Sequence, residues 1–159
     1  MLEQRPIGTL TQYHAWPDRF AEMAQRVAAD HGAAIPGPAR AVSANAGSLL
    51  RIHPQRLWYV SESATSPQQS LPPEIGVSLD LAQARAAIHV AASMAEPLLS
   101  RFVTVDLRPQ HFAVDGLALT PLHKVGVLIW KRSDGIDILA PRSFAASLWD
   151  LLSETAKRL

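Results

Sequence analysis

The chain has 159 residues, a mass of 17.3 kDa and a formal net charge of +1 at pH 7. This near balance lacks the basic excess that nucleic-acid binding requires, so we expect no nucleic-acid partner. Hydrophobic residues make up 48% of the sequence, enough for a packed core. No apolar stretch reaches the ~18 residues that span a bilayer, and no internal repeat is visible, so we predict a single domain over 1–159 and no membrane partner.

The chain has no cysteine, which excludes disulfides, thiolate zinc sites and thiol nucleophiles. Residues 1–6 show no apolar run behind a basic start, so no signal peptide is predicted and a cytoplasmic location is expected. Charged residues make up only 18%. Such a low fraction indicates apolar surface left over for a partner.

The first half of the chain predicts one helix and one hairpin. Apolar residues at helical spacing indicate a helix over 17–30, with Pro17 at its first position and Gly32 as its C-terminal cap. Alternating apolar residues on both sides of a Pro-Gln turn predict a β-hairpin over 49–61. Residues 61–73 are rich in Ser, Gln and Pro and predict an exposed, mobile loop.

The middle of the chain predicts strands over 77–79 and 86–91, followed by a short helix that runs to Phe102. Ser93 and Glu96 have the spacing of a capping box, in which each side chain accepts from the other residue's backbone amide, so we expect them to begin that helix.

The last third predicts three strands and a helix. One strand follows the turn at 115–116, and the nearly continuous apolar run over 125–131 is typical of a strand buried on both faces. Asp-Gly at 134–135 predicts a hairpin turn into the strand 136–139, which Pro141 ends. A final helix is expected from Ser143, with these residues facing inward: Phe144, Leu148, Leu151 and Leu152. Strands in antiparallel hairpins with helices on one face give an α+β fold class.

Six histidines suggest metal or acid–base chemistry, but no two stand at helical i,i+3 or i,i+4 spacing. We therefore interpret them as structural or surface residues. His89 alternates with apolar neighbours in a strand, and only His111 and His123 flank one predicted strand region where they could converge. The full set is His14, His31, His53, His89, His111 and His123.

The carboxylates fall in predicted turns and strand ends, where aspartate usually caps or turns backbone: Asp80, Asp106, Asp115, Asp134 and Asp137. The sequence contains no nucleophile elbow, dinucleotide fingerprint or P-loop. Core packing is the default interpretation of the tryptophans, and a partner anchor is the alternative: Trp16, Trp58, Trp130 and Trp149. Arg142 stands between a strand and a helix, where it is either a carboxylate-binding residue or a solvent-exposed helix start.

Ordered short blocks from about residue 10 to the C-terminus resemble the gamma subunit family of heterotetrameric sarcosine oxidase. The hairpin block is LRIHPQRLW at 50–58, and the most specific block is PRSFAASLW at 141–149. The shorter blocks are AWP at 15–17, LDL at 79–81, ARA at 84–86, VDL at 105–107 with Phe112 and Gly116, and LIW at 128–130. The family often opens its middle helix with Gly-Pro, where this chain has Ala92, Ser93 and Met94.

The resemblance implies a fold similar to the folate-binding domain of the glycine-cleavage aminomethyltransferase. It implies a non-catalytic gamma-type subunit that binds alpha, beta and delta subunits, with FAD, FMN, NAD and tetrahydrofolate on the large chains and zinc on the delta chain. The complex would oxidise sarcosine to glycine, forming hydrogen peroxide and methylenetetrahydrofolate. No catalytic, cofactor-binding or metal residue transfers to this chain.

Two questions stay open at this point. The partner enzyme uses either sarcosine or another N-methyl amino acid, and the isolated chain is either a monomer or a homodimer. The alternative function is a stand-alone folate-binding protein with the aminomethyltransferase-like fold.

Overall fold

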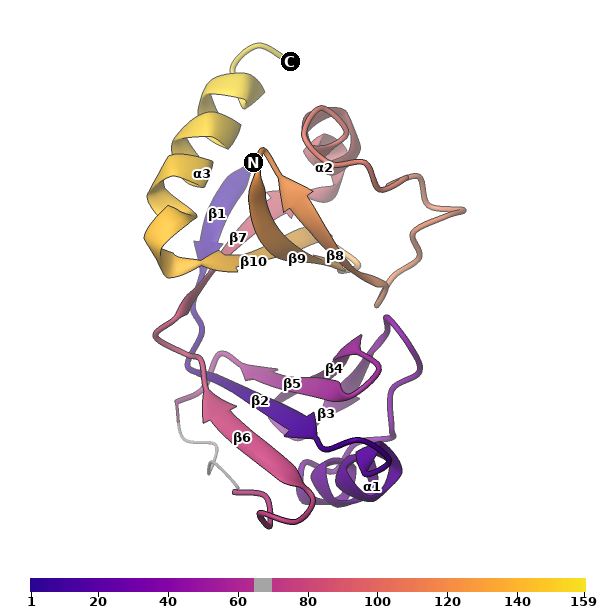
Figure 1. Cartoon of the computed structure of the whole chain (residues 1–159). Coiled ribbons are helices and arrows are strands. Elements are labelled where there is room, and N and C mark those ends of the chain that lie inside the picture. The colour runs from indigo at the N-terminus through magenta and orange to yellow at the C-terminus, as the bar shows by residue number, and fades with distance from the viewer. Residues whose placement is uncertain (65–69) are drawn as a thin grey trace. The chain divides into compact units, whose positions relative to one another are not determined.

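The computed structural model describes residues 1–64 and 70–159, which form two compact units (Figure 1). Unit 1 comprises Met1–Pro6 and Ala84–Leu159, and unit 2 comprises Ile7–Gln83. Each unit has its own antiparallel sheet and its own hydrophobic core. Local sequence patterns do not indicate this division, and the expectation that 1–159 forms one gamma-subunit-like domain stays a prediction.

Unit 1 contains a five-stranded sheet in the order β1-β7-β10-β9-β8, and every neighbouring pair is antiparallel. Its strands are β1 (Leu2–Arg5), β7 (Arg85–Ala91), β8 (Leu117–Leu122), β9 (Val125–Lys131) and β10 (Gly135–Pro141). Its helices are α2 (Ala92–Leu99) and α3 (Arg142–Ala156), which cover one face of the sheet. Four successive side chains of β9, residues 127–130, are buried, which confirms the strand predicted to be buried on both faces.

Unit 2 contains a second five-stranded antiparallel sheet, in the order β3-β4-β5-β2-β6. Its strands are β2 (Thr9–Ala15), β3 (Ala41–Ala44), β4 (Gly47–His53), β5 (Arg56–Ser61) and β6 (Gly76–Asp80). Helix α1 (Phe20–Asp30) packs four apolar side chains on one face of this sheet: Met23, Ala24, Val27 and Ala28. The α+β class with helices on one face of each sheet is therefore confirmed.

The two helices of unit 1 begin in the same way, directly from the end of a strand. β7 runs into α2 and β10 runs into α3, and neither start has a side-chain cap. The backbone N–H of Ala92 donates to the carbonyl of Asp134 at 2.9 Å, and that of Arg142 donates to the carbonyl of Ala84 at 2.9 Å. Distant carbonyls thus satisfy donors that a helix start leaves unpaired. The predicted capping box at Ser93 is wrong for this reason, since the helix starts one residue earlier.

Two other sequence predictions for the helices need correction. Helix α1 begins at Phe20 rather than Pro17, because Asp18 adopts a left-handed φ of 65° in a turn that a helix cannot include. Its end is as predicted, with Gly32 at φ +60° just beyond the cap. Phe144 does not face the core: 49% of it is exposed, whereas Leu148 and Leu152 are buried.

The predicted loop over 61–73 is only partly testable, because residues 65–69 lie outside the described part of the chain. In the described remainder, Leu71 is buried in the core of unit 2 beside Ile75, so this segment is not wholly exposed. Strands β1, β2 and β3 have no counterpart in the sequence prediction. β1 pairs with β7, more than 80 positions along the chain, which local periodicity does not reveal.

Candidate functional site

Asp137 on β10 and His89 on β7 are buried in unit 1, and a partly buried arginine of β1 lies beside them. Asp137 and His89 occupy paired positions on β10 and β7, each 4% exposed, and the His89 Nδ1 lies 2.7 Å from the Asp137 Oδ1. The other carboxylate oxygen accepts from Arg132 Nη1 at 3.1 Å and from Arg5 Nη1 at 3.4 Å. We call these four residues, with Asp134, the β10 ionic cluster.

The geometry of the β10 ionic cluster indicates a structural role. The remaining ring nitrogen of His89 faces the Asp134 carboxylate at 4.0 Å rather than a hydroxyl group that it could activate. The hydrogen bond from Arg5 lowers the pKa of Asp134 and keeps that carboxyl ionised. Cations and carboxylates therefore compensate one another. The ion pairs of Arg5 fix the short strand β1 to its sheet. His89 is hydrogen-bonded inside the protein, which agrees with its interpretation as a structural histidine.

His31 is the other buried histidine, and it lies in unit 2. Its Nε2 is 2.9 Å from the Tyr13 hydroxyl, and its ring stacks on Tyr59 with centroids 3.8 Å apart. Burial lowers the pKa of His31, against a smaller opposing effect of Asp30. The neutral ring is thus the form that this packing favours.

The histidine pair singled out for possible convergence is not brought together. His111 lies 3.7 Å from the carboxylate of Asp106, whereas the His123 ring makes an edge contact with Phe102. Across residues 1–64 and 70–159, no group of three or more histidines and carboxylates is arranged to hold a metal ion.

Two of the five predicted turn aspartates accept hydrogen bonds from nearby backbone amides, as their positions indicated. The Asp80 carboxylate accepts from the Ala82 amide at 2.9 Å, and Asp106 accepts from the Arg108 amide at 3.1 Å. The Arg108 guanidinium also holds the pKa of Asp106 well below its usual range. Asp137 differs, because the sequence does not reveal that it is buried in a strand.

The tryptophans divide into two groups. Trp58 and Trp130 are buried, as the default interpretation predicted, and Trp149 packs half-buried against the core of unit 1. Trp16 is 44% exposed, and its indole N–H donates to the Pro73 carbonyl at 2.6 Å. The core prediction is therefore wrong for Trp16.

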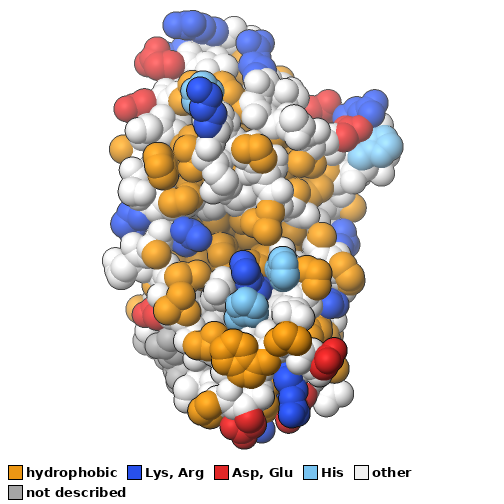
Figure 2. Space-filling model, in the orientation of Figure 1, with side chains coloured by type: hydrophobic (Ala, Val, Ile, Leu, Met, Phe, Trp, Pro, Cys, Tyr) orange, Lys and Arg blue, Asp and Glu red, His pale blue; other side chains and the backbone are white. Residues whose placement is uncertain are grey.

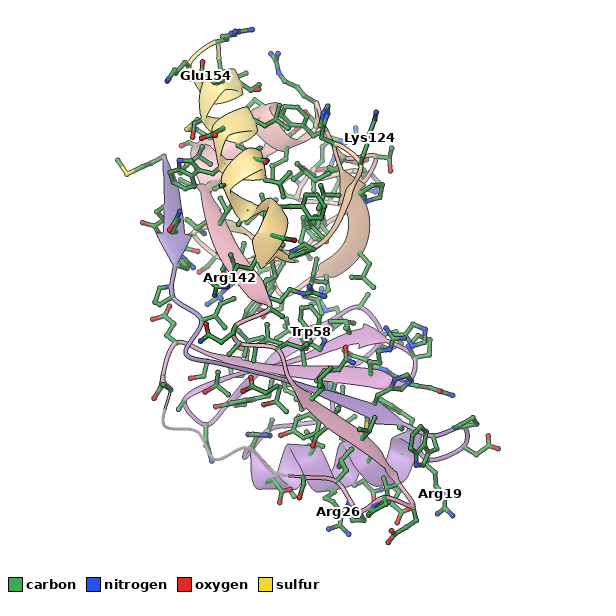
Figure 3. All side chains as sticks on the ribbon, turned by 60° about the vertical axis from the view of Figure 1, so that its left-hand side comes forward. Arg19, Arg26, Trp58, Lys124, Arg142 and Glu154 are labelled. Atoms are coloured by element: carbon green, nitrogen blue, oxygen red, sulfur yellow. The ribbon has the colours of Figure 1, made fainter. Side chains whose placement is uncertain are left out.

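Arg142 is exposed at the first position of α3 (Figure 3). Its Nη2 donates to the backbone carbonyl of Arg85 at 2.9 Å. This bond ties the start of α3 to the start of β7. It agrees with the interpretation of Arg142 as an exposed helix-start residue, while the carboxylate-binding interpretation stays a prediction.

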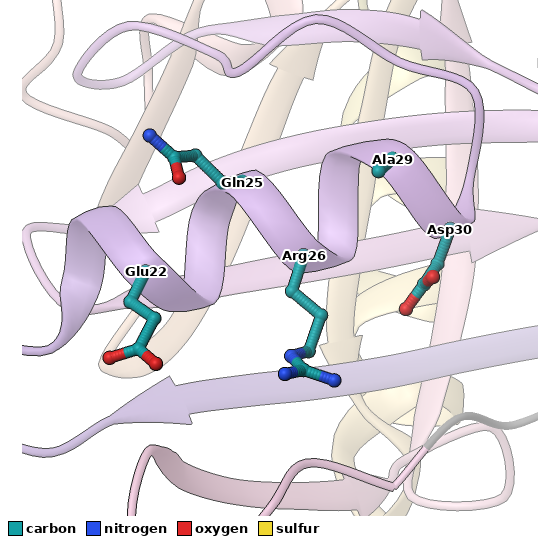
Figure 4. Close-up of a pocket in the computed structure, with 5 residues that line it drawn as sticks. All are labelled: Glu22, Gln25, Arg26, Ala29 and Asp30. Carbon is teal, nitrogen blue, oxygen red and sulfur yellow. The ribbon is translucent and has the colours of Figure 1, made fainter.

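Two hollows in unit 2 differ in chemistry. The first, of about 410 Å³, lies along α1, and its lining residues come from this one helix: Glu22, Gln25, Arg26, Ala29 and Asp30. Along this helix Arg26 lies between the acidic residues Glu22 and Asp30 on one side, and Gln25 points to the other side (Figure 4). The second, of about 270 Å³, lies at the end of β4 and contains two basic side chains, Arg51 and His53, among apolar residues. Sequence reasoning missed it, because its two walls are more than ten residues apart.

Taken together, the two units define an α+β protein with two antiparallel sheets; α2 and α3 cover one face of the first sheet, and α1 covers one face of the second. No protein-family model matches the chain, and no curated protein matches it. Among solved structures, it is similar to a chain of the heterotetrameric sarcosine oxidase from Corynebacterium sp. U-96, in complex with pyrrole 2-carboxylate. The two are 23% identical, the match covers 97% of this chain and 84% of that chain, and the TM-score is 0.77. The resemblance predicted from the sequence blocks is therefore confirmed at the level of the fold.

No helix in the part of the chain that the structure describes has the length and apolar character to cross a membrane.

Proposed function

We propose that this chain is a non-catalytic gamma-type subunit of a heterotetrameric, flavin-dependent sarcosine oxidase, and that it works in the cytoplasm. The observation that carries the proposal is the fold likeness to a chain of such an enzyme over nearly the whole length of this chain. The ordered sequence blocks, above all the one at 141–149, support the gamma assignment.

The arrangement of the polar residues supports a role in assembly. The buried charges of the β10 ionic cluster bind one another, and His31 is held by tyrosines. By contrast, several large apolar side chains are about half exposed: Trp16, Val77, Leu79, Leu119 and Phe144. Exposed apolar side chains of this size favour burial against another protein.

In the proposed complex, the chemistry belongs to the partner subunits. The alpha and beta chains hold FAD, FMN, NAD and tetrahydrofolate, and the delta chain holds zinc. The complex converts sarcosine to glycine with release of hydrogen peroxide, and it passes the methyl carbon to tetrahydrofolate. This chain covers and orders a surface of the large chains.

The first experiment purifies the isolated chain and the chain co-expressed with its alpha, beta and delta subunits. We expect the isolated chain to show no flavin absorbance and to form no hydrogen peroxide from sarcosine, whereas the tagged chain retrieves the flavoprotein chains when co-expressed. Oxidase activity in the isolated chain would contradict the proposal.

Surface variants then locate the contact. Leu79→Asp and Phe144→Asp each place a negative charge at an exposed apolar position. Gln25→Glu is the matched control, because it places a negative charge at an exposed polar position on α1. We expect at least one apolar-position variant to lose partner capture while the control retains it. Titration calorimetry with tetrahydrofolate tests the alternative function, which a saturable heat with the isolated chain would support.

A further inference from the structure

Three basic side chains lie side by side on one face of the sheet of unit 2. Arg56 on β5 pairs in register with His14 on β2 and with His53 on β4. Residues directly opposite one another on antiparallel strands project from the same face, with Cβ atoms about 4.5–5.5 Å apart. We call His14, Arg56 and His53 the basic row, and Arg56 is its centre.

The basic row lies on the face of this sheet that α1 does not cover. Tyr13 and Leu57, the neighbours of His14 and Arg56 along their strands, pair with each other and belong to the core beneath α1. Because successive side chains of a strand point to opposite faces, His14 and Arg56 project from the other face. His53 is exposed and the other two are partly exposed, so solvent reaches the row.

The positive charge of the basic row is not offset by ion pairs. Within the described ranges 1–64 and 70–159, no carboxylate pairs with any of its three members. The adjacent row along the sheet consists of Leu79, Gln12, Trp58 and Leu50, which are all uncharged. The charge of Arg56 is therefore open to an anion from solution.

The basic row also has donors to offer. The Arg56 Nε is buried and has no hydrogen-bond partner among the residues that the structure describes. A buried donor without an acceptor is unfavourable, and a bound oxyanion supplies one. The His53 Nδ1 accepts from the Gln55 amide at 3.2 Å, which leaves Nε2 as the ring nitrogen that carries the proton and donates.

The three side chains act on one another electrostatically. Burial lowers the pKa of His14, and the positive charges of Arg56 and His53 lower it further, which requires both side chains to be near His14. Figure 2 shows two histidine side chains beside a Lys or Arg side chain, with hydrophobic side chains around them, on the face of unit 2 that it draws. An anion bound among the three side chains relieves this mutual repulsion.

We propose that the basic row binds a phosphate group, either as inorganic phosphate or as a small phosphomonoester. The planar Arg56 guanidinium donates two parallel hydrogen bonds to one phosphate, and His14 and His53 donate from the flanking strands. A phosphate has at least three terminal oxygens to accept these bonds, whereas a carboxylate has only two. This site is separate from the proposed assembly role and does not rest on it.

The test is a heteronuclear NMR titration of the full chain at neutral pH and constant ionic strength. The probes are inorganic phosphate, phenyl phosphate as a monoester, and acetate as a carboxylate. We expect phosphate to bind saturably, to shift the ring signals of His14 and His53 together, and to raise the pKa of His14. Acetate should bind about tenfold more weakly or worse, since it leaves donors unpaired. The tighter of the two phosphate probes identifies the source of the phosphate group.

Arg56→Gln should weaken phosphate binding by about tenfold or more, as expected for lost bonds to a charged group. Arg26→Gln is the matched control, because Arg26 is an exposed arginine of α1, on the opposite face of the sheet, and it should leave the affinity unchanged. His53→Gln, at an exposed position, should weaken binding by about threefold or more and keeps the proposal testable if Arg56→Gln fails to fold.

Three results would overturn the proposal. The first is that neither inorganic phosphate nor phenyl phosphate gives saturable shifts. The second is binding of acetate as tight as that of both phosphate probes, which would show a general attraction of anions without phosphate recognition. The third is a phosphate affinity that stays unchanged in both Arg56→Gln and His53→Gln.

Discussion

Replacing Asp137 by alanine should be among the most destabilising single changes in unit 1. The carboxylate is 4% exposed and binds His89 at 2.7 Å, Arg132 at 3.1 Å and Arg5 at 3.4 Å. Removing one partner of a buried ion pair typically costs about 3–5 kcal/mol. Here the two arginine side chains are 19% and 35% exposed, so water partly solvates them after the change and the lower end applies. We therefore expect a loss of about 3 kcal/mol in the free energy of unfolding.

Asp134 provides the matched control, because it binds the same Arg5 from the adjoining turn but its side chain is 56% exposed. Exposed ion pairs are typically worth about 0–1 kcal/mol, so Asp134→Ala should have a small effect. Urea unfolding measures both variants, and a loss of about 3 kcal/mol lowers the midpoint by roughly 1–2 M. A background with Trp16→Phe and Trp58→Phe restricts the fluorescence to the two tryptophans of unit 1. Equal losses of unfolding free energy for Asp137→Ala and Asp134→Ala would refute the reasoning that the buried carboxylate of Asp137 contributes more to stability than the exposed carboxylate of Asp134.

Three further predictions concern stability. The pKa of His31 in the folded chain lies below its ordinary value of 6.5, so the unfolded chain binds more protons than the folded chain as pH falls through 6.5. The urea midpoint should therefore decrease as the pH is lowered through this range, and it should decrease less steeply in His31→Gln. An unchanged slope would contradict this. Gly135→Ala places a methyl group against the backbone oxygen of Val90 and should cost about 1–3 kcal/mol in the free energy of unfolding, whereas Gly126→Ala meets nothing within 4 Å and should be nearly neutral by the same assay. Leu148→Ala should lower the free energy of unfolding by about 2–5 kcal/mol, whereas Phe144→Ser, at a half-exposed position, should lower it far less. Similar losses for the two variants would show that Phe144 is part of the core.

The strands and helices that sequence reasoning identified are those with strong local signals. The hairpin of β4 and β5, the strands β7, β9 and β10, and the three helices follow from apolar periodicity and turn residues. The missed strands β1, β2 and β3 lack such signals. β1 has only four residues, and its stability comes from pairing with β7 and from the ion pairs of Arg5. Contacts between residues far apart in sequence do not appear in a local pattern.

The same reason explains the errors at helix starts and in the candidate sites. Ser93 and Glu96 have the spacing of a capping box, but a carbonyl of the β9–β10 turn satisfies the start of α2 instead. Asp137 looks like a strand-end carboxylate in sequence, and only the register of β7 against β10 places it beside His89. Arg51 alternates with apolar residues in a predicted hairpin. The hollow that Arg51 lines also includes Pro38 and Ala39, which the sequence identified only as part of a connector.

Native mass spectrometry can show whether this chain assembles into a flavin-dependent oxidase. The sample is the full chain co-expressed with the alpha, beta and delta subunits. We expect one dominant species that contains a single copy of each chain together with bound flavin. A flavin-loaded assembly of the other subunits that forms without this chain, while the chain itself remains a free monomer or homodimer, would contradict it.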